Sequence, residues 1–340
     1  MKKNLANFLT NSANKFPNKK AITFESTTVT YKELDILVNK LASGLYRTGL
    51  RAEDRVILML PSSLNWVLFY YALAKIGAIV IPVNPLYRRG ELEYIINDSR
   101  AKAFIGHSDY LDEAKYAFEK SNIIRYKIVS GQCTDPDFIN MDNLFDYINS
   151  FDTYDAEEDD PFAIIYTSGT TGKPKGAILT HSSLMNDAIA VSNVRKYYPN
   201  DVVLSVLPLF HIYGQTHALN ISIYLGLSIR MWERFDASGV LKAIEEEEST
   251  ILYAVPTMIN RLIELANERP PKKSSLRFCI SGGASLPVEV LHRFENIFHT
   301  TIYESYGLTE FSPTCIENPF GKKTKPGSIG LPIPPFKVRI

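Results

Sequence analysis

The chain has 340 residues, of which 45% are hydrophobic and 22% are charged, and its 37 basic side chains balance its 37 acidic ones. This length exceeds one ordinary core and predicts two or three packed units of a globular protein, while the balanced charge argues against nucleic acid or anionic lipid as a partner. The three cysteines are far apart and odd in number, which excludes a disulfide framework and a zinc ribbon and predicts a reducing cytoplasm.

The N-terminal region predicts a helix with a defined start and end. Residues 1–17 contain two lysines in the first three positions but no apolar run long enough for a signal peptide. Thr30 followed three residues later by Glu33 is the pattern of a capping box, in which each side chain bonds the backbone at the other position. We therefore expect a helix that begins after Thr30 and ends near Gly49, a residue type that often terminates helices.

The most apolar segment, residues 55–87, could be mistaken for a membrane span. A spanning helix needs about 20 consecutive apolar residues, and this segment is interrupted by prolines, an asparagine, a lysine and a glycine. Its pattern predicts a strand at residues 56–60, a helix at 64–75 and a second strand at 78–81. The segment therefore indicates a βαβ unit and no integral membrane segment.

The remaining elements predict an α/β fold with two packed αβαβα-type subdomains whose sheets are mostly parallel. The first subdomain is expected at residues 1–158 and the second at 159–325, with an acidic, solvated linker at residues 149–161. The glutamate run at residues 243–250 predicts an exposed helix end. Further strands are expected at residues 162–166, 202–207, 228–232, 251–255, 278–281 and 301–303.

The pattern of the last residues predicts the start of a β element that is incomplete in this chain. Residues 327–340 contain Gly and Pro punctuation followed by one alternating, strand-like segment. A single strand has no partner, so we expect residues 326–340 to begin a third, β-barrel subdomain that is truncated in this chain.

One segment, "IIYTSGTTGKPKGAILTH" at residues 164–181, combines flexibility, hydroxyl groups and positive charge directly after an apolar strand. Glycines allow backbone N–H groups to approach an anion, hydroxyls add donors and lysines add charge, which together indicate a phosphate-binding loop. A Walker A loop has four residues between its glycines and Ser or Thr after its lysine. Only two residues separate Gly169 from Gly172, and Pro174 follows Lys173, so a P-loop NTPase is rejected.

The string "YTSGTTGKPKGA" resembles the phosphate-loop signature of the adenylate-forming superfamily of acyl-CoA synthetases, aryl-CoA ligases, luciferases and amino-acid adenylation domains. Three further segments resemble the other motifs of this superfamily and occur in the same order. They are "VLPLFHIYG" (206–214), "ISGGASLP" (280–287) and "YESYGLTE" (303–310). The resemblance covers nearly the whole chain and is nearest to bacterial medium- and long-chain fatty acid–CoA ligases.

The resemblance implies ATP, Mg²⁺ and coenzyme A as cofactors and assigns a role to individual residues. Glu310 would be the Mg²⁺ carboxylate, Thr309 would contact the α-phosphate and Thr167 would assist at the metal and phosphates. Tyr306 would stack on adenine, which the turn of Gly283, Ala284 and Ser285 would edge with backbone groups. The remaining implied ATP- or AMP-binding residues are Ser168, Gly169, Thr170, Thr171, Gly172, Lys173, Lys175, Glu304, Ser305 and Gly307.

The second motif would line the carboxylate end of an acid pocket with His211, Tyr213 and Gly214, and we expect His211 to act in catalysis without serving as a general base. Adenylation needs no base because the substrate carboxylate is already ionised at neutral pH. Residues 210–214 contain no carboxylate that could pair with a substrate ammonium, so amino acids are disfavoured. A fatty acid is the favoured substrate, and an aryl acid remains the nearest alternative.

Relative to the superfamily, this sequence contains no match to the C-terminal lid domain with its lysine, nor to the aspartate that holds the ribose. We therefore expect the N-terminal domain of an acyl-CoA ligase, which would be weakly active or inactive by itself. Two alternatives stay open: transfer of the acyl group to a carrier protein, and a truncated, non-catalytic module that binds nucleotide or acyl groups. A homodimer and transient contact with a membrane also stay open.

Overall fold

The computed structural model describes residues 3–145, 149–167, 172–246 and 249–339. The chain divides into two compact units, each described by itself below. Unit 1 comprises Met1–Asn18, Tyr31–Met185 and Leu209–His211, and unit 2 comprises Lys19–Thr30, Asn186–Pro208 and Ile212–Ile340. As predicted, the fold is α/β with two largely parallel sheets. The subdomain boundaries expected from the sequence stay predictions.

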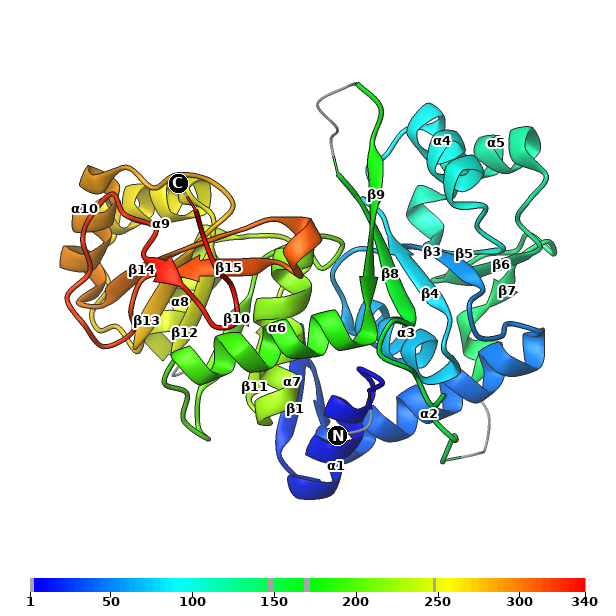
Figure 1. Cartoon of the computed structure of the whole chain (residues 1–340), viewed down its shortest axis with the longest axis horizontal. Coiled ribbons are helices and arrows are strands. Elements are labelled where there is room, and N and C mark those ends of the chain that lie inside the picture. Colours follow the sequence, from blue (N-terminus) through cyan, green and yellow to red (C-terminus); the bar gives the residue numbers. More distant parts are fainter. Residues whose placement is uncertain (1–2, 146–148, 168–171, 247–248, 340) are drawn as a thin grey trace. The chain divides into compact units, whose positions relative to one another are not determined.

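Unit 1 is built on a seven-stranded sheet with the order β7-β6-β5-β3-β4-β8-β9 (Figure 1). All neighbours are parallel except β8 and β9, which form an antiparallel hairpin. The strands are β3 (Arg55–Met59), β4 (Ile79–Pro82), β5 (Ala103–His107), β6 (Tyr126–Ser130), β7 (Ile139–Asn140), β8 (Pro161–Thr167) and β9 (Lys175–Thr180).

The helices of unit 1 lie on both faces of this sheet, with α2 and α3 together and α4 and α5 together (Figure 1). Besides two short 3₁₀ turns, η1 (Ser108–Tyr110) and η2 (Met141–Leu144), they are α1 (Asn7–Lys15), α2 (Tyr31–Thr48), α3 (Leu64–Ile76), α4 (Arg89–Ser99) and α5 (Leu111–Ser121). Strands buried on both faces explain the nearly continuous apolar runs in the sequence, because helices cover each side.

The predicted βαβ unit is confirmed as β3, α3 and β4, and its local chemistry explains its bounds. Ser63 precedes α3 in extended conformation and its side chain accepts the Trp66 N–H, while Gly77 ends the helix with φ of 76°. A left-handed backbone conformation at this position favours glycine, because glycine has no Cβ atom. The predicted helix after Thr30 is confirmed as α2, which ends directly before Gly49.

Unit 2 is built on a nine-stranded sheet with the order β16-β15-β14-β13-β12-β10-β11-β1-β2. The strands from β14 to β1 are parallel, and antiparallel strands complete both ends. The strands are β1 (Lys20–Phe24), β2 (Thr27–Thr30), β10 (Val202–Ser205), β11 (Ser228–Met231), β12 (Ile251–Ala254), β13 (Phe278–Ser281), β14 (Thr301–Gly307), β15 (Thr314–Glu317) and β16 (Leu331–Pro332).

Helices cover both faces of the unit 2 sheet as well, and α6 (His181–Val194) carries the chain out of unit 1 into unit 2. The others are a π-helix η3 (Gly214–Asn220), α7 (Ile221–Leu225), α8 (Ala237–Glu246), α9 (Pro256–Glu268), α10 (Val288–Phe298) and a 3₁₀ turn η4 (Thr309–Phe311). The π-helix was not predicted from the sequence; such turns are rare and occur often at functional sites.

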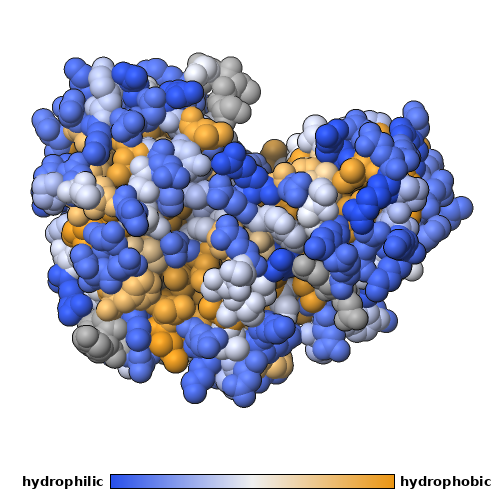
Figure 2. Space-filling view, turned by 180° about the vertical axis from the view of Figure 1, so that it is seen from behind, coloured by the Kyte–Doolittle hydropathy of each residue, from blue (hydrophilic) through white to orange (hydrophobic). Residues whose placement is uncertain are grey.

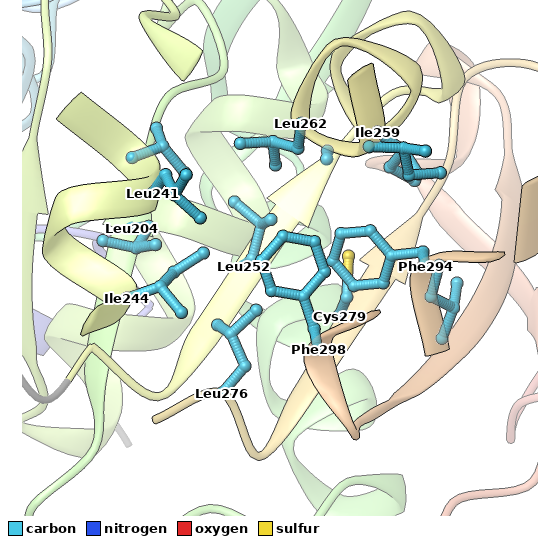
Figure 3. Close-up of a cluster of buried hydrophobic side chains, with 14 of the residues drawn as sticks. Leu204, Leu241, Ile244, Leu252, Ile259, Leu262, Leu276, Cys279, Phe294 and Phe298 are labelled. Carbon is cyan, nitrogen blue, oxygen red and sulfur yellow. The ribbon is translucent and has the colours of Figure 1, made fainter. Parts of the chain in front are cut away.

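The core of unit 2 follows the two-residue period of its strands. Leu252 and Cys279 point to one face, where they pack with side chains of α8, α9 and α10 (Figure 3). The rings of Phe294 and Phe298 on α10 close this cluster with centroids 4.4 Å apart. Tyr253 and the other alternate residues point to the opposite face, where they pack with the π-helix and its flanks.

Most acidic side chains of the predicted linker at residues 149–161 are exposed, as expected. Its backbone is held at two points, where the Tyr154 N–H donates to the Lys75 carbonyl at 2.8 Å and the Asn149 carbonyl accepts from Asn39 at 3.0 Å. One expectation needs correction. The predicted exposed helix end contains buried Glu245, which pairs with Arg269. Residues 247–248 of that segment lie outside the described residues. The hairpin β1–β2 was not predicted because each strand is short and pairs within a sheet formed mostly by distant segments.

At the C-terminal end, β16 pairs antiparallel with β15, so part of the segment 326–340 lies in the unit 2 sheet. The third, β-barrel subdomain remains a prediction. Figure 2 shows one face of the chain, where hydrophilic side chains cover most of the surface and apolar side chains gather in smaller patches. Within the described ranges, every helix is too short or too polar to span a bilayer.

Candidate functional site

The predicted phosphate loop connects the two strands of the β8–β9 hairpin in unit 1. Register pairs Thr167 with Lys175 at its base, and Ser168, Gly169, Thr170 and Thr171 lie outside the described residues. Gly172 has φ of 92°, a backbone conformation that favours glycine. The loop therefore leaves a buried sheet through one partly buried threonine and returns through exposed lysines.

The returning arm of this loop is held by α4. The Tyr94 hydroxyl donates to the Pro174 carbonyl at 3.0 Å, and the Lys173 ammonium lies 5.9 Å from the centre of the Tyr94 ring. Lys173 and Lys175 are both exposed. Two exposed ammonium groups on an anchored arm are suited to bind an anionic group such as a phosphate chain.

The predicted adenine-binding residues lie where β13 and β14 end in unit 2. The two strands are parallel neighbours, with Ser281 opposite Glu304. After β13 the chain forms an exposed turn at residues 283–285, in which Gly283 has φ of 80°. Tyr306, which follows β14's buried part, is 43% exposed. Since parallel strands end at the same edge of a sheet, the turn and the tyrosine ring lie at one edge, open to a flat ligand.

Glu304 differs from the exposed Tyr306 and Gly307 because it is buried. Burial raises the pKa of its carboxyl group, and hydrogen bonds from the Leu286 and Gly327 N–H groups oppose that shift. Its backbone N–H donates to the Asn318 side chain at 2.8 Å. Glu304 thus connects the residue after the 283–285 turn and the segment before β16 to β14. Ser305 is half-buried beside it, and Gly307 is exposed.

The turn that carries Thr309 and Glu310 is fixed by backbone contacts. The Leu308 N–H donates to the Pro313 carbonyl at 2.9 Å, which closes the turn. A Cβ at Gly307 would lie 1.7 Å from the Pro313 oxygen, so only glycine fits there. Glu310 is exposed at the turn and Thr309 is half-buried. An exposed carboxylate suits Mg²⁺, a hard cation that usually takes one or two protein carboxylates and substrate phosphates.

The residues predicted for the acid pocket fall in different surroundings. His211 belongs to unit 1 and is an exposed residue, and partial desolvation lowers the pKa of its imidazole. Tyr213 belongs to unit 2, where its buried hydroxyl donates to the Ile280 carbonyl at 3.1 Å. A Cβ at Gly282 would lie 3.1 Å from the Tyr213 ring, so Tyr213 packs directly behind the turn at residues 283–285.

Gly214 begins the π-helix and is required by its contacts. A Cβ at this position would lie 2.5 Å from the Pro208 carbonyl oxygen, a backbone atom that cannot easily move. The structure therefore gives Gly214 a packing role within unit 2. The wide turn that follows it brings the Tyr213 and His217 rings into edge contact, with centroids 4.7 Å apart.

Sequence reasoning missed a buried polar network in unit 2, which we call the Arg195 network: Asp187, Arg195, His217, Thr314 and Glu317. Arg195 makes two hydrogen bonds to Glu317, at 2.6 and 2.7 Å, and a third to His217 Nδ1 at 3.0 Å. His217 Nε2 lies 2.7 Å from Thr314 Oγ1, and the Thr314 N–H donates to Asp187 at 3.1 Å. No local pattern could have revealed it, since Arg195 and Glu317 are 122 residues apart.

Surface cavities also occur away from the predicted site residues. One, of about 370 Å³ in unit 1, is lined in part by Lys115, Lys127, Asp135 and Asp137. These charges pair locally, with Lys115–Asp135 at 2.7 Å and Lys127–Asp137 at 3.4 Å. Glu119 also lines the cavity and leaves one carboxylate in excess, which does not suit an anionic phosphate group, so the motifs above remain the better candidate site.

Comparison with known proteins places these observations in context. The family model described as AMP-binding enzyme matches residues 9–340. A long-chain-fatty-acid–CoA ligase of Bacillus subtilis (strain 168) is 33% identical over 98% of this chain and 64% of its own length. The 4-coumarate–CoA ligase 3 of Arabidopsis thaliana is 33% identical over 88% of this chain and 55% of its own. The chain thus spans less than two thirds of the length of both relatives.

Solved structures agree with these sequence relatives. A long-chain-fatty-acid–CoA ligase from Archaeoglobus fulgidus superposes with a TM-score of 0.90 at 26% identity, covering 98% of this chain and 69% of that one. The anthranilate–CoA ligase AuaEII, solved with anthranoyl-AMP, superposes with a TM-score of 0.92 at 26% identity, covering 97% of this chain and 64% of that one. Each protein resembles this chain in fold and in sequence.

Proposed function

Because the chain belongs to the AMP-binding enzyme family, we propose that its protein activates a carboxylic acid with ATP and passes the acyl group to coenzyme A. The observation that carries the proposal is the group of exposed residues at one edge of the unit 2 sheet: the turn 283–285, Tyr306 and Glu310. This edge offers backbone groups, an aromatic face and a carboxylate, which are what adenine and a metal-bound triphosphate require.

The chemistry proceeds in two displacements. A carboxylate oxygen attacks the α-phosphorus of ATP and pyrophosphate leaves, which forms an acyl-adenylate. The thiol of coenzyme A, after losing its proton, then attacks the acyl carbon, and AMP leaves. When bound, Mg²⁺ neutralises charge on the phosphate oxygens. The first step needs in-line positioning and charge neutralisation more than proton transfer, because the attacking carboxylate is already ionised.

The residues predicted to bind ATP and Mg²⁺ keep their roles in this proposal, and His211 would line the carboxylate end of the acid pocket, whereas Gly214 has a packing role. Glu310, with help from Thr167, would hold Mg²⁺, and Thr309 would contact the α-phosphate. The loop at residues 168–175 would bind the outer phosphates, a role that the exposed Lys173 and Lys175 support by their charge. Tyr306 would stack on adenine with the turn of Gly283, Ala284 and Ser285 at its edge, and Glu304, Ser305 and Gly307 would shape the strand beneath it.

A fatty acid is the proposed substrate, and an aryl acid is the second candidate. The 33% identical Bacillus subtilis relative, named a long-chain-fatty-acid–CoA ligase, supports the first. The anthranilate–CoA ligase structure and the 4-coumarate–CoA ligase support the second. Tyr213, whose buried hydroxyl donates to the Ile280 carbonyl, would line the carboxylate end of the pocket for either acid class. The cytoplasmic location, a homodimer and the carrier-protein alternative stay predictions.

The test of the proposal uses the full-length protein and follows acid-dependent exchange of radiolabelled pyrophosphate into ATP. Alkanoates from short to long chains, about 4 to 16 carbons, are compared with benzoate and 4-coumarate at equal concentration. We expect exchange with at least one acid class, and Glu310→Gln to lower it about a hundredfold or more, because the metal-binding charge is lost. Glu268→Gln, which changes an exposed glutamate elsewhere in unit 2, is the matched control.

Two outcomes would contradict the proposal. No exchange with any acid would remove the adenylation activity itself. Full exchange in the Glu310→Gln variant would leave the activity in place and remove Glu310 as the metal carboxylate. The rank order of alkanoate, benzoate and coumarate rates decides between the two acid classes.

A further inference from the structure

The turn that carries Glu310 rests on three hydrogen bonds to helices. Thr216 Oγ1, on the π-helix, donates to the Ser312 carbonyl at 3.0 Å. The Thr314 N–H donates to Asp187 on α6 at 3.1 Å, and Thr314 Oγ1 lies 2.7 Å from His217 Nε2. Ser312 and Thr314 are almost fully buried, whereas Glu310 is exposed. The turn thus presents its functional side chain outward from a buried, hydrogen-bonded base.

The hydrogen-bond donors of this network define a single tautomer of His217. Arg195 can only donate, so His217 Nδ1 accepts its hydrogen bond and Nε2–H donates to Thr314 Oγ1. Burial, together with the Arg195 charge, lowers the pKa of His217 well below its usual range. A neutral ring held from both nitrogens has a fixed orientation, and Glu317 balances the charge of Arg195 behind it.

His217 also contacts the acid-pocket motif. Its ring meets the Tyr213 ring edge-on at a centroid distance of 4.7 Å, and Tyr213 in turn bonds the Ile280 carbonyl directly before the adenine turn. One imidazole therefore touches a residue of the acid-pocket motif and the base of the turn with Glu310. This arrangement lies entirely within unit 2.

We propose that His217 is a positioning residue for adenylation, which acts through Thr314 to hold the Thr309–Phe311 turn in its reactive geometry. The inference rests on the proposed function, because it assigns a geometric role to the turn that carries Glu310. His217 touches no reacting atom in this scheme; it fixes where the metal carboxylate stands. Small displacements of such groups slow in-line reactions strongly, because the attacking and leaving atoms must align.

The test removes one hydrogen bond without removing volume. Thr314→Val deletes the hydroxyl that accepts from His217 and keeps the shape of the side chain. Thr300→Val is the matched control, since Thr300 is similarly buried and its hydroxyl makes no hydrogen bond within the described residues. In the full-length protein we expect Thr314→Val to slow single-turnover adenylate formation about tenfold. The amplitude of the single turnover should stay unchanged, and KM for the acid should stay within about twofold.

A second variant and a second readout make the result decisive. His217→Asn keeps an acceptor for Arg195 but withdraws the donor from Thr314, so its effect should not add to that of Thr314→Val. Amide hydrogen exchange at residues 308–312 should quicken about tenfold in both variants and stay unchanged in Thr300→Val.

The proposal is overturned if the single-turnover rate is unchanged, if only KM for the acid rises, or if the two substitutions add fully. A rise confined to KM would mean that these residues line the acid site and do not position the turn. If the unaltered protein formed no adenylate with any acid, the proposed function would fail, and amide exchange would still decide whether His217 orders the turn.

Discussion

Each unit contains a buried cation among polar partners, but the two clusters stabilise different parts of the molecule. In unit 1, Lys75 on α3 donates to Thr10 at 3.1 Å, Asp35 at 2.9 Å and Asn39 at 2.7 Å, which satisfies all three protons of its ammonium group. These partners lie on α1 and α2, so the cluster joins three helices and touches no predicted site residue.

The unit 2 cluster differs in burial and in position. The Arg195 and Glu317 side chains are 0% and 2% exposed, whereas Asp35 in unit 1 keeps 18% of its side chain accessible. The Arg195 network also reaches the turn that carries Glu310 through His217 and Thr314. The comparison teaches that the same physical device, a buried cation hydrogen-bonded to several polar partners, serves helix packing in one unit and the geometry of a candidate site in the other.

Arg195→Met should have the largest effect, because it leaves Glu317 buried without a cation. Loss of one partner of a buried pair costs about 3–5 kcal/mol of unfolding free energy. Urea unfolding followed by circular dichroism measures the loss. Arg195→Met combined with Glu317→Met should recover part of it, since two matched apolar side chains bury no charge. A loss below about 1 kcal/mol in the single variant would mean that Glu317 is neutralised in another way.

The second prediction concerns the pH dependence of the unfolding free energy that a buried histidine in unit 1 should cause. Burial lowers the pKa of His181 to about 4 from 6.5, and its ring stacks on Phe162 with centroids 4.7 Å apart. Because the folded-state pKa is depressed, the unfolded chain binds the proton more readily below pH 6.5. The unfolding free energy should therefore fall by about 3 kcal/mol as the pH drops from about 6.5 to about 4.

The measurement for His181 is a difference between two proteins, which cancels the other titrating groups. Asp187 in unit 2 contributes with the opposite sign, because burial raises the pKa of its carboxyl group well above the usual range. Unfolding free energies of the unaltered protein and of His181→Gln are compared between pH 7 and pH 4.5 (about 1 unit steps suffice). If the unfolding free energy changed equally with pH in both proteins, His181 would not be the cause of the pH dependence.

Lys75→Met should cost less than Arg195→Met, since its partner Asp35 keeps contact with water. We expect a loss of about 1–3 kcal/mol, with no change in the single-turnover rate of the folded protein. Lys242→Met is the control, because the Lys242–Glu246 pair is exposed and should contribute less than about 0.5 kcal/mol. A slower single-turnover rate in Lys75→Met would break the distinction between the two clusters.

The smallest effect is expected for Thr10→Val, which deletes one threonine hydroxyl from the unit 1 cluster just as Thr314→Val deletes one in unit 2. Its hydroxyl lies 3.1 Å from Lys75 Nζ and 3.2 Å from Asp35. The unfolding free energy should fall by about 1 kcal/mol with the adenylation rate unchanged. Equal rate losses in Thr10→Val and Thr314→Val would show that both act through stability alone.

Much of the fold could be predicted from local patterns. The apolar run of β3, the Ser63 cap of α3 and the left-handed Gly77 are adjacent in sequence, so period and turn chemistry identified the βαβ unit. The predicted strand at 278–281 matches β13 because four consecutive buried residues end in a glycine turn. The order of four motifs along the chain also identified the family to which the chain belongs.

The tertiary structure decided what depends on distant partners. The hairpin β1–β2 joins the unit 2 sheet by pairing with β11, more than 200 residues later. A local hydrophobic pattern does not predict pairing between such distant segments. The sequence by itself determined the elements with a clear local pattern, the motif residues and the predicted chemistry, because these depend on side chains close together along the chain. Only the folded chain determined that His217 and Thr314, 97 residues apart, share a hydrogen bond, because a buried polar group takes whichever partner the packing of whole elements brings within reach.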